Sequence, residues 1–570
     1  NEIAALQGAK DIIAEMVSEN QQARNTVRNM YKREAVLSSM VIKKMKSTDV
    51  AQKFSDYFDF SEPLRSCNSH RLLAMRRGET LGILRVSISI DEKDCIERLN
   101  RQFVHGKGAC QTLVAEAIED SFKRLINPSI ENEFARLSKE KADEDAIKVF
   151  TENLRQLLLS APLGQKRVLA LDPGYSNGCK IACLDAQGSL LHHEIIYPHP
   201  PKRLYAQATV AMMRMINQYH IEAIAIGNGT ASRESKEFVT DCITHLSEEG
   251  KETPKVFVVS EDGASIYSAS AIAREEFPNE DVTTRGAVSI GRRLIDPLAE
   301  LVKIDPKSIG VGQYQHDVDQ AELRRSLDLT VESCVNQVGV NLNTASKHLL
   351  MYVSGLGSVL AQNIVDYRKE HGAFTSRTQL KKVPRLGTVA YQQSAGFLRI
   401  PNAKNPLDNS AVHPESYHIV EAMAKNKNCT VKELINNKKL LEHINLEEFV
   451  STEVGLLTLN DILHELEKPG RDPREQLKEF EFDKSVHTIA DLKEGMELPG
   501  IVTNITNFGV FVDVGVHQDG LVHISQLNSK FVSNPNTIVH LHQHIYVKVI
   551  EIDSKRNRIG LSMKNIKQPI

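Results

Sequence analysis

Apolar residues recur three and four positions apart through most of the first 160 residues of the chain. This spacing gives a helix one apolar face, so the region is predicted to be mostly helical. Between Leu81 and Ile90, apolar and polar residues alternate instead, which favours a strand or a hairpin. The helical pattern resumes from Ala109 to Leu159. We therefore expect a helical N-terminal part with a small β element.

The pattern changes at Lys166, where short apolar runs typical of buried strands begin. The predicted elements are strands at 167–171, 179–184 and 190–197, a helix at 204–219, a strand at 223–226, a helix at 234–246, a strand at 255–259 and a helix at 264–276. A meander of three strands, followed by strands that return through helices, is the order of an RNase H-like α/β domain.

The last part of the chain reads as β structure. From about Leu492 to Asn565, four or five short β-rich runs are separated by Gly, Asp and Asn turns. This spacing predicts a small closed β-barrel of the OB type, whose strand face binds nucleic acid. Between Leu301 and the barrel, helical patterns dominate and are interrupted by two glycine-centred hairpins.

Composition narrows the class of protein. A chain of 570 residues holds about three to five domains, and 41% hydrophobic with 25% charged residues is ordinary for a globular protein. No apolar run approaches ~18 residues, so no membrane span is expected. The chain starts at Asn1 without a Met, and we expect it to be a fragment. The eight cysteines form no Cys-x-x-Cys pair, which predicts reduced thiols and no metal site.

Positive charge is concentrated around the two hairpins, although the whole chain has a net charge of −3. Residues 341–400 contain eight basic and two acidic side chains. Gly355-Leu-Gly357 and Arg385-Leu-Gly387 fit two helix-hairpin-helix turns, where a helix N-terminus binds a phosphate oxygen. Lys381, Lys382 and Arg385 flank the second turn. The alternative is an ordinary solvated helical face.

A carboxylate at the end of a predicted strand is the first candidate for catalysis. Asp172 is followed by Pro-Gly, and RNase H-like nucleases gather three or four such carboxylates around two Mg²⁺. Glu234 and Glu261 are the candidate partners. On the late helix, however, Arg285 stands where an acid is needed, and its charge would repel the metal. We therefore favour a retained fold with an inactive site; the alternative is a metal-dependent, structure-selective nuclease. An actin-like ATPase is less favoured, since no second phosphate loop is found.

Two aromatic residues in the barrel are candidates for stacking on unpaired bases. Phe508 and Phe511 point to opposite faces of a regular strand, and a bulge at Gly509 would bring them together. The alternative is that one of them belongs to the core. The segment also resembles an S1 RNA-binding domain over its whole length, from Gly500-Ile-Val through Asp519-Gly-Leu-Val-His523 to Arg558-Ile-Gly-Leu-Ser. The resemblance implies that Phe508, Phe511 and His523 contact RNA, with Lys548 and Arg558 as basic neighbours.

The order of the parts resembles the Tex family of transcription accessory proteins across nearly the whole chain. Stretches that carry the resemblance include Gly227-Asn-Gly-Thr-Ala-Ser-Arg-Glu234, Asp296-Pro-Leu-Ala-Glu300 and Val412-His-Pro-Glu-Ser-Tyr417. The Cys and His content also fits a vertebrate member. The resemblance implies a scaffold that binds nucleic acid in transcription or RNA metabolism, with an RNase H-like (YqgF) module lacking nuclease activity.

The expected fold is multidomain and mainly α-helical, with an RNase H-like α/β domain, helix-hairpin-helix modules and a C-terminal OB-type barrel of the S1 kind. The expected boundaries are 1–162 (helical), 165–305 (YqgF/RNase H-like), 318–405 (tandem helix-hairpin-helix), 406–490 (helical linker) and 492–567 (S1). Expected partners are single-stranded RNA or DNA, duplex DNA, and transcription or ribosomal proteins. A protein-interaction scaffold with little affinity for nucleic acid is a third hypothesis. No cofactor or metal is expected. The expected state is an intracellular monomer, nuclear in a eukaryote and cytoplasmic in a bacterium.

Overall fold

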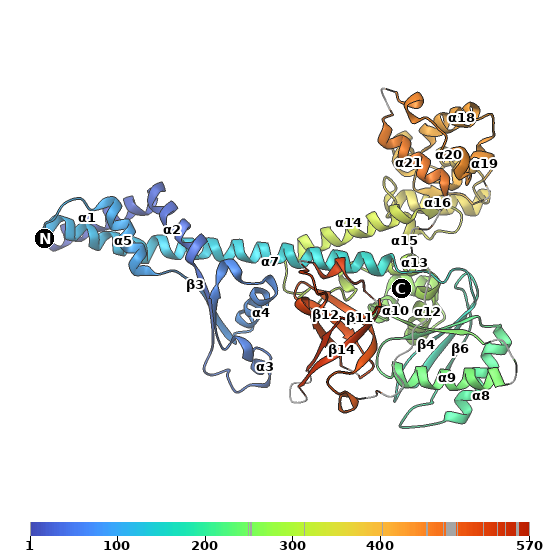
Figure 1. Ribbon diagram of the computed structural model, residues 1–570, viewed down its shortest axis with the longest axis horizontal. Helices are drawn as coiled ribbons and strands as arrows, with labels where there is room; N and C mark the ends of the chain where they lie inside the picture. The colour runs from blue at the N-terminus through green and yellow to red at the C-terminus, as the bar shows by residue number, and fades with distance from the viewer. Residues whose placement is uncertain are drawn as a thin grey trace. The chain divides into compact units, whose positions relative to one another are not determined.

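The computed structural model describes residues 2–248, 250, 253–312, 314–401, 403–451, 454–470, 472, 474, 486, 488–516, 518–532, 534–541, 543–553 and 558–568 (Figure 1). The chain divides into two compact units. The first unit is Asn1–Phe150 with Gly312–Leu323, and the second is Thr151–Val311 with Arg324–Ile570. Among the described residues, no helix combines the length and the apolar character needed to cross a membrane.

The first unit is helical apart from one three-stranded antiparallel sheet. Strand β1 (Val36–Val41) lies between β2 (Asp59–Pro63) and β3 (Leu84–Ser89). Strand β3 falls in the stretch where alternation favoured a strand, and its side chains alternate between buried and exposed. The apolar pattern does not reveal β1 and β2, which contain serines and charged residues. The main helices, in chain order, are α1 (Glu2–Glu19), α2 (Gln21–Glu34), α3 (Asp49–Gln52), α4 (Ser69–Thr80), α5 (Glu92–Phe103), α6 (Ala109–Asp120) and α7 (Asn127–Leu158), which continues into the second unit.

The second unit contains a five-stranded mixed sheet with the order β6-β5-β4-β7-β8. Strands β4, β5 and β6 form an antiparallel meander, whereas β7 and β8 join β4 in parallel. This is the predicted RNase H-like order, and it is confirmed. The elements are β4 (Val168–Asp172), β5 (Cys179–Leu184), β6 (Leu190–Ile196), α8 (Tyr205–Tyr219), β7 (Ala223–Gly227), α9 (Ser232–Glu248), β8 (Lys255–Val259), α10 (Ala264–Ala269), α11 (Ala271–Glu276), α12 (Val282–Ile295) and α13 (Pro297–Leu301).

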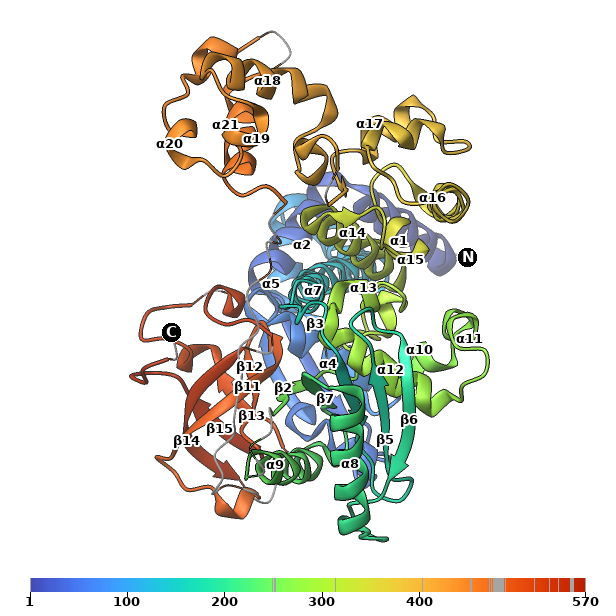
Figure 2. The same cartoon turned by 90° about the vertical axis from the view of Figure 1, so that its right-hand side faces the viewer.

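Helices cover both faces of this sheet, as Figure 2 shows. On one face, Leu169 and Leu171 of β4 pack against apolar residues of α8 and α9. On the other face, Val168 and Ala170 face α12. Gly291 allows α12 to approach closely, because a Cβ there would lie 2.9 Å from the Cβ of Ala170. The two-sided cover explains why these strands read as continuous apolar runs.

A helical part follows the sheet and contains the two hairpins. Its main elements are α14 (Gln320–Val338), β9 (Val340–Asn341), α15 (Lys347–Leu350), α16 (Gly357–His371), α17 (Thr388–Ser394), β10 (Leu398–Arg399), α18 (Tyr417–Asn426), α19 (Val431–Leu434), α20 (Lys438–Leu441) and α21 (Leu456–Glu467). Strands β9 and β10 pair in parallel and join the two ends of the hairpin region. Helices α18 to α21 share a separate apolar core, centred on Val420, Met423 and Leu459.

The C-terminal part is a closed barrel in the order β11-β12-β13-β15-β14. Its strands are β11 (Glu497–Thr506), β12 (Gly509–Asp513), β13 (Gly520–His523), β14 (His544–Asp553) and β15 (Arg558–Ser562). Buried valines, leucines and isoleucines alternate with outward residues and fill the interior. The register shifts at Val502/Asn504 in β11 and at Val549/Glu551 in β14. The predicted OB-type barrel is confirmed.

Candidate nucleic-acid interface

Phe508 and Phe511 lie close together on the outside of the barrel. Their ring centroids are 6.0 Å apart and the ring planes are perpendicular. A bulge at Gly509 is not what brings the rings together, because Gly509 pairs regularly with His523. Phe508 instead belongs to the turn before β12, so strand alternation does not govern its direction. A side chain at Gly509 would collide with the backbone of β13, since a Cβ there would lie 2.4 Å from the carbonyl oxygen of Val522.

His523 and Lys548 continue this wall of the barrel. His523 lies opposite Gly509 and directly follows Val522, which pairs in parallel with Leu561, the residue before Ser562. Lys548 lies opposite Ser562 on the next strand. The imidazole Nδ1 of His523 accepts a hydrogen bond from the backbone N–H of Ser525, which fixes the ring at the barrel surface. One row thus runs from the Phe508 turn through His523 to Lys548.

The structure does not bring Arg558 into this row. Arg558 stands at the start of β15, opposite Asp553, whereas Ser562 is at the other end of the strand. An opposite charge across the strand pair is a common stabilising arrangement. Of the five barrel residues named from the sequence, four therefore share one wall and Arg558 lies apart.

The first hairpin presents an open helix start. Helix α16 begins at Gly357. The residue before it, Leu356, has no side-chain oxygen to cap the first N–H groups of the helix. Apart from its chain neighbours and the nearby backbone of its own helix, no described atom lies within 4 Å of the place where a Cβ of Gly357 would be. Gly355 has φ +81° and packs against the side chain of Gln393 in α17. The first N–H groups of α16 are therefore accessible to an anion.

The second hairpin has the same form but a shorter helix. Gly387 caps α17, with open space around it among the described atoms. Arg385, in the turn before it, adopts a left-handed φ of +65°. Lys381, Lys382 and Arg385 are all exposed, and the Lys381 ammonium lies 4.7 Å from the ring centre of Tyr391. Since α17 has seven residues, its helix dipole is weaker than that of α16.

The positive charge of this region is smaller at the surface than the sequence suggests. Arg377 is completely buried. Its guanidinium donates hydrogen bonds to the carbonyl oxygens of Leu398, Val412 and Ser410. Arg368 likewise donates to two backbone carbonyls, at 2.9 and 3.1 Å. Both arginines add to the positive charge counted from the sequence, but their guanidiniums are occupied by backbone carbonyl oxygens rather than presented to a phosphate.

Asp172 and Glu261 form the centre of the RNase H-like site. Asp172 ends β4, and Glu261 follows β8, with its backbone N–H held by the Asn228 side chain at 3.0 Å. Burial raises the pKa of Asp172, while the positive charge of Lys180 opposes that shift. Burial also raises the pKa of Glu261, and the negative charge of Asp172 adds to the effect. The two carboxylates therefore affect each other electrostatically.

The remaining residues expected at this site lie differently. Glu234 accepts a hydrogen bond from the Tyr175 hydroxyl at 2.7 Å. Arg285 does not face the carboxylates as expected, because its guanidinium donates to the carbonyl oxygen of Phe277 at 2.8 and 3.1 Å. Gly286 of α12 lies close to Asp172, since a Cβ at this position would be 4.0 Å from a carboxylate oxygen.

Helix α12 contains no Asp or Glu, as the sequence already indicated, so the helix that packs on the strand of Asp172 supplies no carboxylate. One feature of the site was missed from the sequence. Lys180 lies opposite Asp172 in the β4–β5 pair, and strand alternation could have revealed it. Among the described residues, no group of three or more His, Cys, Asp or Glu is arranged to hold a metal ion.

Family comparisons cover most of the chain. Residues 1–150 match the Tex central region-like family, residues 166–295 the Tex protein YqgF-like domain, and residues 491–564 the S1 RNA binding domain. Residues 335–399 match a helix-hairpin-helix motif family, and residues 405–474 a second HHH domain family.

Relatives match the chain from end to end. "Transcriptional accessory protein Tex" of Neisseria gonorrhoeae is 48% identical over 99% of this chain and 74% of that protein. "Protein YhgF" of Escherichia coli is 46% identical over 99% of this chain and 74% of that protein. The human "S1 RNA-binding domain-containing protein 1" is 34% identical over 98% of this chain and 63% of that protein. The chain therefore belongs to the Tex family of transcriptional accessory proteins.

Proposed function

We propose that this Tex-family chain is a nucleic-acid-binding scaffold associated with transcription, and that its RNase H-like module does not cut nucleic acid. The observation that carries the proposal is the wall of Phe508, Phe511, His523 and Lys548 on the barrel. Two aromatic rings and a basic side chain in one row suit a single strand, whose bases stack while its backbone meets the cation.

The barrel and the hairpins act together in this proposal. Stacking contributes ~1–3 kcal/mol per base, so two rings provide about 2–6 kcal/mol. A micromolar dissociation constant corresponds to about 8 kcal/mol. The difference is supplied by phosphate contacts at the start of α16 and at Lys381 and Lys382, which do not depend on sequence. Single-stranded RNA or DNA is the proposed ligand of the barrel and of these phosphate contacts, and duplex DNA is a further proposed ligand of the hairpins.

Reversing the charge of the hairpin lysines tests their contact with phosphate. In the double variant Lys381→Glu/Lys382→Glu, affinity for nucleic acid should fall, and the slope of log K against log salt should decrease by about 0.7–0.9 for each lost phosphate contact. The measurement is a titration of the full chain with labelled duplex and single-stranded probes at several salt concentrations.

The matched control is Lys43→Glu/Lys44→Glu, an adjacent and exposed pair in the first unit. It makes the same change in net charge away from the hairpins, so the slope should stay near that of the unaltered chain. A slope left unchanged by the Lys381/Lys382 variant would remove the hairpins from the interface.

Two observations support the absence of nuclease activity. Helix α12 provides no carboxylate beside Asp172, and Mg²⁺ in such sites requires several oxygen ligands in near-octahedral geometry. The Lys180 ammonium also stands across the strand pair from Asp172, where it competes with a cation for the carboxylate.

We expect labelled RNA, single-stranded DNA and duplex DNA to stay intact when incubated with the full chain and Mn²⁺, as judged on a denaturing gel. The competing hypothesis, a metal-dependent nuclease, is favoured by the electrostatic coupling of Asp172 and Glu261. It predicts shortened probes, and it predicts that Asp172→Asn protects them. That result would make the chain an enzyme.

A further inference from the structure

The connection from β13 to β14 holds a phenylalanine ring almost entirely in solvent. Phe531 is 95% exposed, the highest value among the large apolar side chains of the described residues. Its neighbours along the chain are anchored: Leu527 and Val532 are buried and belong to the core of the barrel. Single apolar residues are common at surfaces. A ring held outward between two buried anchors, however, presents both of its faces to a ligand.

Strand pairing places this connection at the end of the barrel that carries Phe508. Phe508 lies in the turn between β11 and β12, and its carbonyl oxygen accepts a hydrogen bond from the backbone N–H of Ile524 at 2.8 Å. Ile524 directly follows β13, so β13 ends there. Strand β14 runs antiparallel to β11 and pairs its first residue, His544, with Ile501, so β14 begins toward the same end. The connection therefore starts and finishes beside the aromatic wall.

The distance along the chain from the wall to Phe531 is short. A single turn, η10 (Ile524–Gln526), follows His523 of the wall. The carbonyl oxygen of Gln526 accepts a hydrogen bond from the backbone N–H of Met563 at 2.9 Å, which fixes this turn to the end of β15. Phe531 is five residues after Gln526, and an extended chain spans at most ~3.6 Å per residue. The two Cα atoms therefore lie within about 18 Å of each other.

Lys530 supplies a cation next to the ring. Its side chain is exposed and, within the part of the chain that the structure describes, takes part in no ion pair. The backbone N–H of Lys530 donates to the side-chain oxygen of Asn528 at 3.3 Å, which tightens the turn before Phe531. A ring and an ammonium group in adjacent positions suit one nucleotide of a single strand, because the base stacks while the phosphate meets the cation.

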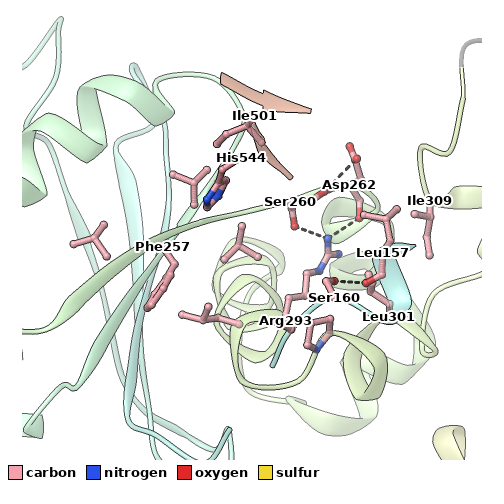
Figure 3. A pocket seen from close by; sticks show the side chains of 16 residues that line it. Leu157, Ser160, Phe257, Ser260, Asp262, Arg293, Leu301, Ile309, Ile501 and His544 are labelled. Atoms are coloured by element: carbon pink, nitrogen blue, oxygen red, sulfur yellow. Dashed lines mark hydrogen bonds between the residues drawn. The ribbon is translucent and has the colours of Figure 1, made fainter. Parts of the chain in front are cut away.

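Other parts of the barrel surface are occupied within the second unit. Ile501 of β11 and His544 of β14 line a cavity of about 170 Å³ beside β8 (Figure 3). The side chain of Asn153 in α7 donates a hydrogen bond to the carbonyl oxygen of Ile505 at 3.1 Å. These contacts use β11 and the start of β14. They leave the ring of Phe531 uncovered.

The surroundings of the ring favour a nucleic acid over a protein partner. Protein interfaces have an apolar centre of several residues, whereas Ser529, Lys530 and Asn534 around Phe531 are polar and exposed. A stacked base needs only one ring face, and its phosphate needs only one cation.

We propose that Phe531 and Lys530 form a second stacking site, which takes an unpaired base and its phosphate from a strand already bound on the barrel wall. This inference rests on the proposed function, since the wall delivers the strand. The site extends the bound length of the strand beyond Phe508 and His523. It adds affinity without sequence preference, because every base has a face that can stack.

The length of the strand tests the proposal. Oligouridines of about four and about twelve nucleotides lie toward the two ends of the range that one barrel of this type binds. Fluorescence anisotropy with the full chain measures both. Phe531→Ala should weaken the longer one at least about fivefold, the lower limit for one stacked base, and leave the shorter one unchanged. The matched control is Val210→Ala, which removes a 69% exposed apolar side chain on α8 and should change neither affinity.

A fluorescent variant reports stacking directly. The chain contains no tryptophan, so Phe531→Trp creates its single indole. The longer oligouridine should quench this indole and bind with unreduced affinity. In the control Val210→Trp, the single indole lies on α8 and should not be quenched.

Two further variants separate the ring from the charge. Phe531→Leu keeps an apolar side chain without a ring face, so it should lose as much affinity for the longer strand as Phe531→Ala. Lys530→Gln should decrease the salt slope for the longer strand by about 0.7, the value for one phosphate contact on a single strand.

Unchanged affinity of Phe531→Ala for the longer strand would overturn the proposal, and so would an unquenched indole in Phe531→Trp; the ring would then be available to a protein partner. Full affinity of Phe531→Leu would also overturn it, because the contact would not be stacking. An unchanged slope in Lys530→Gln would remove Lys530 from the site. If the unaltered chain binds neither oligouridine, the proposed function fails. If it binds both and the Phe531 variants have no effect, only this inference fails.

Discussion

Replacing Arg377 with methionine should unfold the hairpin region locally, with a loss of about 3–5 kcal/mol in its free energy of opening. The buried guanidinium serves the carbonyl oxygens of Leu398, Val412 and Ser410, and its Nη1 also lies 2.8 Å from the hydroxyl of Tyr417. Methionine matches the apolar stem but leaves each of these acceptors without a donor. Four buried acceptors lost at once explain the size of the effect.

The same substitution also removes the positive charge that lies near a buried carboxylate. Asp408 is 2% exposed and accepts hydrogen bonds from the Tyr417 hydroxyl at 2.8 Å and from the backbone N–H of Arg377 at 3.1 Å. With the guanidinium gone, no charge balances that carboxylate through Tyr417. Removing one partner from such a buried network costs more free energy than the intact network contributes to stability, because the remaining polar groups stay buried without partners.

Hydrogen exchange of backbone amides in α17 and α18, measured on the full chain, reports this local opening. Thermal melting of a multidomain chain does not isolate it, because several transitions overlap. Lys382→Met is the matched control, since Lys382 is exposed and differs from Arg377 mainly in burial. Equal exchange in the two variants would show that the Arg377 network does not hold the hairpin region together.

The double variant Phe508→Ala/Phe511→Ala should weaken single-stranded RNA binding by about 30-fold or more, which corresponds to the ~1–3 kcal/mol expected for each stacked base. The two rings are perpendicular, so one base can lie against the face of one ring while a neighbour meets the other. Stacking releases no counterions, and the salt slope should therefore stay nearly constant while the affinity falls.

The variant Phe508→Tyr/Phe511→Tyr is the control, because it keeps both rings and should retain most of the affinity. Fluorescence anisotropy with labelled single-stranded RNA measures both variants. If alanine and tyrosine variants bind equally well, the aromatic wall is not the RNA site. A fall in the salt slope of the alanine variant would instead indicate that the barrel had shifted its phosphate contacts.

The sequence pattern predicts the fold well where burial controls it. Residues Val168–Asp172 form a strand whose two faces are both covered by helices. A strand buried on both faces needs apolar residues at consecutive positions, so the uninterrupted apolar run predicts it. The barrel is predictable for a related reason, since inward and outward positions alternate along β11 and β14.

The candidate site was harder to predict because its decisive features are three-dimensional. Charge alone makes Arg377 look like a phosphate ligand, although the folded chain encloses it completely. Helical spacing does not show which side of α12 faces Asp172, so Arg285 was expected beside the carboxylates, whereas its neighbour Gly286 lies close to Asp172. The direction of Phe508 depends on a turn, where strand alternation no longer applies.

Gly286 has a consequence for the history of such modules. A Cβ at this position would lie 4.0 Å from the Asp172 carboxylate, at an ordinary van der Waals distance, and the backbone of α12 would not need to move. Every glycine codon becomes an aspartate or glutamate codon through one nucleotide change. A third carboxylate near Asp172 is therefore one mutation away, with Lys180 still opposite Asp172 in the β4–β5 pair. If the module is inactive, as proposed, one substitution brings it closer to the carboxylate set of a two-metal site.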